Sequence, residues 1–191
     1  MKRAVARRWY LPLAVWLVGA LSCATSPRYL HPNADLGNIK TVAVLPFENL
    51  TPERMAGQKV QEVFLLELLS TRAFEVVEPG LVAKVLRDQR IESAANMTPD
   101  DMKRVGAALK VHGMFCGVLL DYAESRGPTP APEVSLQLKL IESRTGATVW
   151  AASETRAGAG VAARLFGVGD ESLVQVVQEL IRRQFTTLLT E

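Results

Sequence analysis

The sequence is poor in the residues and motifs that enzymes use for chemistry. Its 191 residues include two cysteines and two histidines, and it contains no G-x-S-x-G, H-E-x-x-H or C-x-x-C motif. The glycines between 158 and 169 do not directly follow a buried strand, so they do not fit a dinucleotide-binding loop. His31 lies in a linker and His112 in an apolar strand segment, which does not favour a metal pair. We therefore predict that the protein is not an enzyme and has neither a metal nor a cofactor.

A stretch long enough to cross a membrane is also missing at the start of the chain. The apolar run Trp9–Ala20 has twelve residues, whereas a membrane-spanning helix needs about 20. Four cations precede this run, and no acidic residue occurs before Asp35. A short apolar run after a basic start is typical of a secretory signal peptide. We assign residues 1–22 to such a peptide.

The end of this run predicts a lipid anchor. The sequence "ALSC", residues 20–23, resembles the lipobox of bacterial lipoproteins, in which the chain is cut before an obligatory cysteine. On this reading, cleavage falls between Ser22 and Cys23, and Cys23 carries acyl chains such as palmitate. Two or more chains would hold the protein stably at a membrane. Ala24 follows instead of Asp, which favours the periplasmic face of the outer membrane. The alternative is an ordinary secretory signal cut nearby, with Cys23 incidental.

The charge of the chain gives no sign of nucleic-acid binding. Removal of residues 1–22 takes away four cations and no acid, so the net charge falls from +2 to −2. A lipidated Cys23 would leave Cys116 without a disulfide partner. Because Cys116 lies in the apolar segment "VHGMFCGVLL", we expect it to be a buried free thiol that behaves as a small hydrophobic residue.

The remaining chain is predicted to be a tether followed by one domain. Residues 23–38 hold Cys23 and a polar, proline-containing linker, and residues 39–191 form the domain. Strands are predicted at 39–47, 74–79, 111–122, 134–142 and 148–157, because these segments are continuously apolar or alternate between apolar and polar residues. Helices are predicted after the caps at Thr51, Thr98 and Asp170, and at 81–90. The order β-α-β-α-α-β-β-β-α indicates an α/β fold, a single-domain sandwich with a mixed sheet.

One segment without an assigned element carries apolar residues that could contact a partner. Residues 157–169 are rich in glycine and include Val161, Leu165 and Phe166. These three side chains either contact a partner or pack under the last helix, and the sequence leaves both open.

Three segments together resemble the CsgG-like and LpoB-like superfamily of bacterial envelope lipoproteins. They are "IKTVAVLPFENLT", "GAALKVHGMFCGVLLDY" and "VSLQLKLIESRTGATVWAAS", and the resemblance extends over roughly residues 39–157. Relatives include curli-secretion subunits and activators of peptidoglycan synthases. The resemblance implies a non-enzymatic, lipid-anchored periplasmic accessory or assembly protein of an envelope complex. Its partners would be the membrane and an envelope protein complex or its own copies, with no small-molecule substrate evident.

Three other functions remain as alternatives. The chain could activate a peptidoglycan synthase, although residues 24–38 extend at most about 50 Å, a short reach for such a role. A secretion-pore subunit needs a long alternating hairpin, which neither 123–132 nor 157–169 supplies. An envelope hydrolase would require His112 to lie exposed in a cleft beside Asp121 or another acid.

Overall fold

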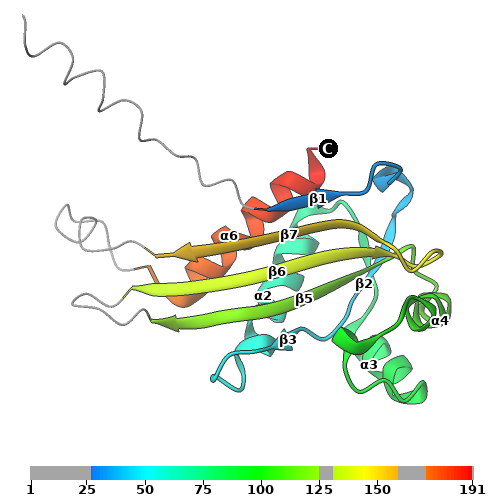
Figure 1. Cartoon of the computed structure of the whole chain (residues 1–191), viewed down its shortest axis with the longest axis horizontal. Helices are drawn as coiled ribbons and strands as arrows, with labels where there is room; N and C mark the ends of the chain where they lie inside the picture. Colours follow the sequence, from blue (N-terminus) through cyan, green and yellow to red (C-terminus); the bar gives the residue numbers. More distant parts are fainter. Residues whose placement is uncertain (1–26, 125–130, 159–170, 191) are drawn as a thin grey trace, which may run out of the picture.

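The computed structural model describes residues 27–124, 131–158 and 171–190, and these form a single α/β domain (Figure 1). Its strands are β1 (Arg28–Leu30), β2 (Thr41–Val44), β3 (Glu48–Asn49), β4 (Glu75–Val76), β5 (Gly113–Glu124), β6 (Pro132–Glu142) and β7 (Thr148–Ala157). Its α-helices are α2 (Ala56–Thr71), α3 (Pro79–Asp88), α4 (Pro99–Leu109) and α6 (Leu173–Leu189). Two 3-10 turns, η1 (Leu36–Asn38) and η2 (Ala94–Asn96), complete these elements.

The described strands make one mixed sheet, with helices on both faces. The strand order is β1-β7-β6-β5-β2-β4, and β3 pairs with β5 outside this path. β2 runs parallel to β4 and β5, whereas β5, β6, β7 and β1 are successive antiparallel neighbours. In Figure 1, α2 and α6 lie behind β5, β6 and β7, while α3 and α4 lie near the end where β5 begins. The predicted α/β fold class with a mixed sheet is confirmed.

β2 is buried on both faces, as its continuous apolar sequence predicts. Val42 and Val44 belong to the core under α2 and α6, whereas Ala43 and Leu45 belong to the core under α3 and α4. Successive side chains of a strand point to opposite faces, so one short strand contributes to both cores. β2 is therefore the element that joins the two helix layers.

The core under α2 and α6 is built around aromatic rings. Phe64 of α2 is completely buried, and its ring centroid lies 5.2 Å from that of Phe47, 5.3 Å from Phe115 and 5.1 Å from Phe185. Tilted and edge-on pairs at this separation are favourable beyond their burial. Segments far apart in the sequence thus meet at one helix residue.

The β6–β7 hairpin and the start of α4 follow the local signals in the sequence. Side chains of β6 alternate between buried and half-buried from Val134 to Leu140, as the sequence predicts. Gly146 in the turn has φ +71°, a conformation that glycine adopts without steric cost. Thr98 caps α4 in a capping box with Asp101, in agreement with the prediction.

The predicted tether is partly wrong, because a strand lies within it. Arg28, Tyr29 and Leu30 pair antiparallel with Ala152, Ala151 and Trp150 of β7. Leu36 also packs against the larger core. The domain therefore begins at β1 and not at residue 39. A three-residue edge strand beside prolines carries no periodic signal, which is why the sequence analysis missed it.

Two predicted helix starts are also wrong. α2 begins at Ala56 and not after Thr51, because the Asn49 side chain accepts hydrogen bonds from the Thr51 N–H (3.0 Å) and hydroxyl (2.8 Å) and holds this stretch in a turn. α6 is capped by Ser172 in a capping box with Gln175, not by Asp170. In both cases the predicted cap, Thr51 or Asp170, is a residue type that often caps helices and lies a few residues before the true start of the helix in the sequence.

The apolar surface of α2 is wider than the face that it buries. Leu66 and Leu69 belong to the apolar residues of this helix, but they are 59% and 51% exposed. An acidic residue between them, Glu67, is buried instead, because Arg182 of α6 pairs with it. This ion pair joins α2 to α6.

Candidate functional site

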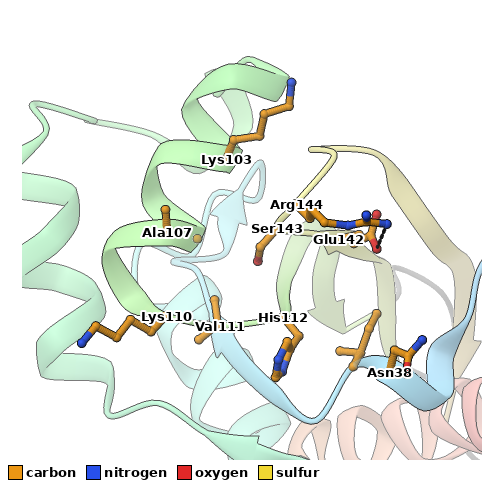
Figure 2. Close-up of a pocket in the computed structure, with 11 residues that line it drawn as sticks. Asn38, Lys103, Ala107, Lys110, Val111, His112, Glu142, Ser143 and Arg144 are labelled. Atoms are coloured by element: carbon orange, nitrogen blue, oxygen red, sulfur yellow. Dashed lines mark ion pairs between the residues drawn. The ribbon is translucent and has the colours of Figure 1, made fainter.

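An open cleft lies at the end of the sheet where β5 begins. It has a volume of about 770 Å3 and lies between α4, the turn after β6 and the chain leading into β2. Figure 2 shows its lining, which comes from three separated stretches around Asn38, Lys103–His112 and Glu142–Arg144. This cleft is the natural place to look for converging functional groups.

His112 lies exposed in this cleft, which corrects the expectation that it is a core residue. The Thr41 N–H donates a hydrogen bond to His112 Nδ1 at 3.1 Å, so a neutral imidazole carries its proton on Nε2. The His112 backbone donates to the Thr41 carbonyl (2.8 Å) and accepts from the Ser143 N–H (2.9 Å). His112 therefore joins β2 to the turn after β6 through its main chain and its side chain.

The acids that could activate His112 do not meet it. Asp121 pairs with Ser135 in the β5–β6 ladder, roughly 27 Å further along β5 at the usual rise per residue. Glu142 lines the cleft, but its carboxylate accepts from the Thr145 hydroxyl (2.6 Å) and pairs with Arg144 (3.7 Å). Within the part of the chain that the structure describes, no hydrogen bond links His112 to either acid. His112 and Asp121 thus do not form the arrangement that an envelope hydrolase would require.

Ser143 is placed for packing and not for nucleophilic attack. Its residue is 7% exposed, and its hydroxyl is buried without a hydrogen-bond partner among the described residues. A Cβ on Gly106 of α4 would lie 2.5 Å from the Ser143 Cβ, so glycine lets the helix approach the turn this closely. The backbone contact to His112 does not form a nucleophile–base pair.

The cations of the cleft do not converge on one point. Figure 2 shows that the Lys103, Lys110 and Arg144 side chains extend in different directions. Lys103 pairs with Asp100 at 3.1 Å, on the outer side of α4. Such a rim gives the cleft a positive edge but no fixed anion site. Three or more metal-binding side chains do not gather anywhere in residues 27–124, 131–158 and 171–190.

A smaller groove lies beside this cleft, between η2, α4 and the open face of β5 and β6. Its volume is about 350 Å3, and its lining includes Met97, Met102, Cys116, Val118 and Ile141. Burial raises the pKa of the Cys116 thiol to about 12, with Lys139 opposing this only slightly. The thiol is therefore neutral at physiological pH. Cys116 keeps some exposed surface, so the expectation of a core cysteine holds only in part.

The residues that the sequence analysis selected for function are not among those that the structure describes. Ser22, Cys23, Val161, Leu165 and Phe166 are all outside the described residues. What the structure adds near them is the pairing of Pro27 and β1 with β7, and the ends of the 159–170 segment. Arg156 of β7 pairs with Glu171 at 3.4 Å, which brings the two ends of that segment together. No helix among the described residues is long and apolar enough to span a membrane.

Comparison with known proteins shows likeness of fold alone. No family model and no curated protein matches the sequence. The PelC dodecamer from Paraburkholderia phytofirmans is 20% identical, with a TM-score of 0.58 over 85% of this chain and 95% of that one. Lipoprotein GNA1162 from Neisseria meningitidis is 15% identical, also with a TM-score of 0.58, over 80% of this chain and 99% of that one.

A third structure is less similar. The C-terminal domain of LpoB from Escherichia coli has a TM-score of 0.47 and is 16% identical over 64% of this chain and 87% of that one, too low a score to carry weight. The predicted likeness to envelope lipoproteins thus has support in the fold of GNA1162, and a CsgG-like relationship is not shown.

Proposed function

We propose that the chain is a lipid-anchored protein of the bacterial envelope that works by binding, as an accessory or assembly subunit of an envelope complex. The observation that supports this most is the shared fold with lipoprotein GNA1162, which covers 80% of this chain. In this chain the domain follows a short apolar run that ends at a cysteine. The divergent cations of the cleft and the separation of His112 from Asp121 favour binding over catalysis.

The anchor in this proposal is Cys23, acylated after cleavage behind Ser22. Each buried methylene contributes about 0.8 kcal/mol, so two or more acyl chains hold a domain at a membrane durably. Ala24 in the position after the cysteine favours the outer membrane and its periplasmic face.

The partner in this proposal is a protein surface, either of an envelope complex or of further copies of this chain. PelC, whose fold is similar, is a dodecamer, which makes self-assembly a natural form of such a role. The candidate contact is the 159–170 segment with Val161, Leu165 and Phe166. Its ends are tied by the Arg156–Glu171 pair and by the Gly158 N–H, which donates to the Pro132 carbonyl. A segment held at both ends can present apolar side chains at one place.

Activation of a peptidoglycan synthase on the opposite membrane is the weaker proposal. Pro27 already accepts a hydrogen bond from the Ser153 N–H at 3.1 Å, so only residues 24–26 separate Cys23 from the folded chain. Three residues add about 10 Å of reach. A protein held this closely suits a partner on its own membrane.

Cross-linking in intact cells tests this proposal. The wild-type chain should cross-link to outer-membrane or periplasmic assembly proteins, or give a ladder of its own copies. Phe166→Asp should weaken that recovery several-fold without unfolding the domain. Leu81→Asp changes an apolar residue that is 45% exposed on α3, so it serves as the matched control and should leave the cross-links unchanged.

The anchor has its own readout in the same cells. Cys23→Ala should move the protein from the membrane to the soluble fraction. Cross-links only to inner-membrane cell-wall synthases would favour the activator function instead. A hydrolase would be revealed if His112→Asn abolished turnover of an envelope polymer by the purified protein, a result that contradicts the proposal.

A further inference from the structure

β1 fixes the chain to the edge of the sheet very close to the proposed anchor. Tyr29 pairs with Ala151, and the flanking main-chain hydrogen bonds run from Ser153 N–H to Pro27 O (3.1 Å) and from His31 N–H to Val149 O (2.9 Å). From Pro27 onward, the position of the chain on β7 is therefore set by a ladder. The sequence analysis predicts a tether of sixteen residues, 23–38. Because of the pairing with β7, only the residues before Pro27 can serve as a tether.

We propose that the end of the sheet at Glu133 and Ala157 faces the lipid surface, and that the cleft around His112 faces away from it. This orientation rests on the proposed acylation of Cys23. The partner of this end of the sheet is the bilayer itself.

The direction of β1 supports the orientation. β1 is antiparallel to β7, so the chain followed backwards from Leu30 to Pro27 moves along β7 toward Ala157. Ala157 pairs with Glu133 at the start of β6, and Glu124 at the end of β5 pairs with Pro132. All three long strands thus meet at the end toward which the N-terminal chain points. In Figure 1 the arrowheads of β5 and β7 mark this end.

The reach of the tether excludes the opposite orientation. Pro27 lies level with Ser153, and Thr148 at the far end of β7 is five residues away, about 17 Å. Cys23 is only four residues from Pro27, and that chain spans at most about 14 Å even with no turn. Cys23 therefore cannot pass Thr148, and the turn at Arg144 lies still further out. In the other direction the same four residues bring Cys23 level with Ala157.

This orientation determines which end of the domain faces the aqueous compartment. β5 has twelve residues and is about 37 Å long, so the cleft at its start is held roughly that far from the lipid surface. A protein partner on the same membrane would contact the side of the domain close to the lipid surface, whereas the cleft stays open to the aqueous compartment.

Quenching of tryptophan fluorescence by brominated lipid acyl chains measures this orientation. Trp150 is the only tryptophan after residue 22 and is buried, so it gives a constant background. A tryptophan is added in separate variants by Ala157→Trp, Leu30→Trp and Arg144→Trp, at three levels along the sheet. The acylated proteins are placed in vesicles of brominated phosphatidylcholine, and intact mass reports the lipid on Cys23 in the same samples.

The expected result is several-fold stronger quenching of the added tryptophan at 157 than at 144, with position 30 weak. Equal quenching at 157 and 144, or the strongest at 144, would overturn the proposal. Strongest quenching at 30 would mean that the β1 edge lies flat on the bilayer, which also contradicts it.

A pair of proline variants tests whether β1 sets the orientation. Tyr29 occupies a hydrogen-bonded position opposite Ala151, so Tyr29→Pro removes a ladder donor and should free the chain as far as residue 38. The N–H of Arg28 points away from β7 in this pattern, so Arg28→Pro is the matched control. We expect the 157-to-144 quenching ratio to fall toward one with Tyr29→Pro and to stay high with Arg28→Pro. A ratio unchanged by Tyr29→Pro contradicts the role of β1.

Failure of the anchor is distinguishable from failure of the orientation. If the cell leaves Cys23 without lipid, the proposed anchor is wrong. The same tryptophan variants of residues 23–191, with Cys116 replaced by alanine, are then joined through Cys23 to a maleimide lipid. The quenching order still decides the orientation.

Discussion

The two helix layers differ in what they hold together. α2 and α6 cover β2, β5, β6 and β7 with an aromatic core, and two ion pairs join α6 to other elements: Arg182 to Glu67 of α2 at 2.8 Å, and Arg183 to Glu154 of β7 at 3.1 Å. α3 and α4 cover a smaller core with no aromatic ring, built mainly on β2 and the start of β5. The layer of α2 and α6 thus packs segments that are far apart in the sequence against one another. The layer of α3 and α4 covers mainly β2 and the start of β5.

This difference shows where the surface is free to bind. The cleft and the smaller groove are both lined by residues of α4 or its approach. We therefore expect substitutions in the larger layer to act on folding and those around α4 to act more locally.

The largest effect should come from the centre of the aromatic cluster. Phe64→Ala removes a ring that contacts Phe47, Phe115 and Phe185 and leaves a cavity where α2, β5, α6 and the loop between β2 and β3 meet. A cost of about 4 kcal/mol in the free energy of unfolding follows from the usual range for such truncations. Urea unfolding followed by circular dichroism measures it. A loss below about 1 kcal/mol would show that the cluster is not the centre of the core.

A smaller effect is expected in the second layer. Leu86 of α3 is 5% exposed, and Leu86→Ala should cost about 2 to 3 kcal/mol, near the lower end of the leucine range because this core is small. Leu81→Ala on the outer side of α3 is the matched control and should change stability by no more than about 0.5 kcal/mol. Equal losses in the two variants would mean that α3 does not bury Leu86 against the sheet.

The smallest effects on stability are expected at the two capping boxes, and these should differ in how their contribution to stability depends on pH. The Thr98 hydroxyl and N–H donate to Asp101, at 2.7 and 2.9 Å, and these bonds lower the pKa of Asp101 below its ordinary value. A lowered pKa stabilises the fold above the unfolded pKa near 3.8, and that stability is lost as the pH falls through the folded pKa. The gap in melting temperature between wild type and Asp101→Asn should therefore shrink from pH 7 to pH 2.

The cap of α6 gives the neutral counterpart. Gln175 replaces the carboxylate there and accepts from the Ser172 N–H at 2.7 Å. Ser172→Ala should cost about 1 kcal/mol at every pH at which the domain is folded. If the Ser172→Ala gap shrinks in acid as much as the Asp101→Asn gap does, the acid dependence does not come from the Asp101 carboxylate.

The sequence predicts those parts of the fold whose signals are local. The buried run of β2, the alternation of β6 and the Thr98 cap each depend on a few consecutive residues, and each is confirmed. β1 could not be predicted in this way, because its three residues become a strand only through the free edge of β7.

The same limit applies to side chains whose role depends on distant partners. Glu67 is buried on α2 because Arg182 of α6, 115 residues away, pairs with it. His112 has apolar residues on both sides in the sequence. It is nevertheless exposed, because it lies just before the start of β5, where the sheet borders the cleft. For the candidate site, Cys23 was predicted from a local pattern, whereas the β1 ladder that restricts its reach required the structure.

The most direct test is the mass of the first tryptic peptide of the chain isolated from bacterial membranes. Trypsin cuts after Arg28, so a chain that begins at an acylated Cys23 releases the peptide of residues 23–28 with the added mass of its acyl chains. We predict this lipid-modified peptide, and its absence from Cys23→Ala. An N-terminal peptide that starts at another residue, or residues 23–28 without lipid, would contradict the proposal that Cys23 anchors the domain to a membrane.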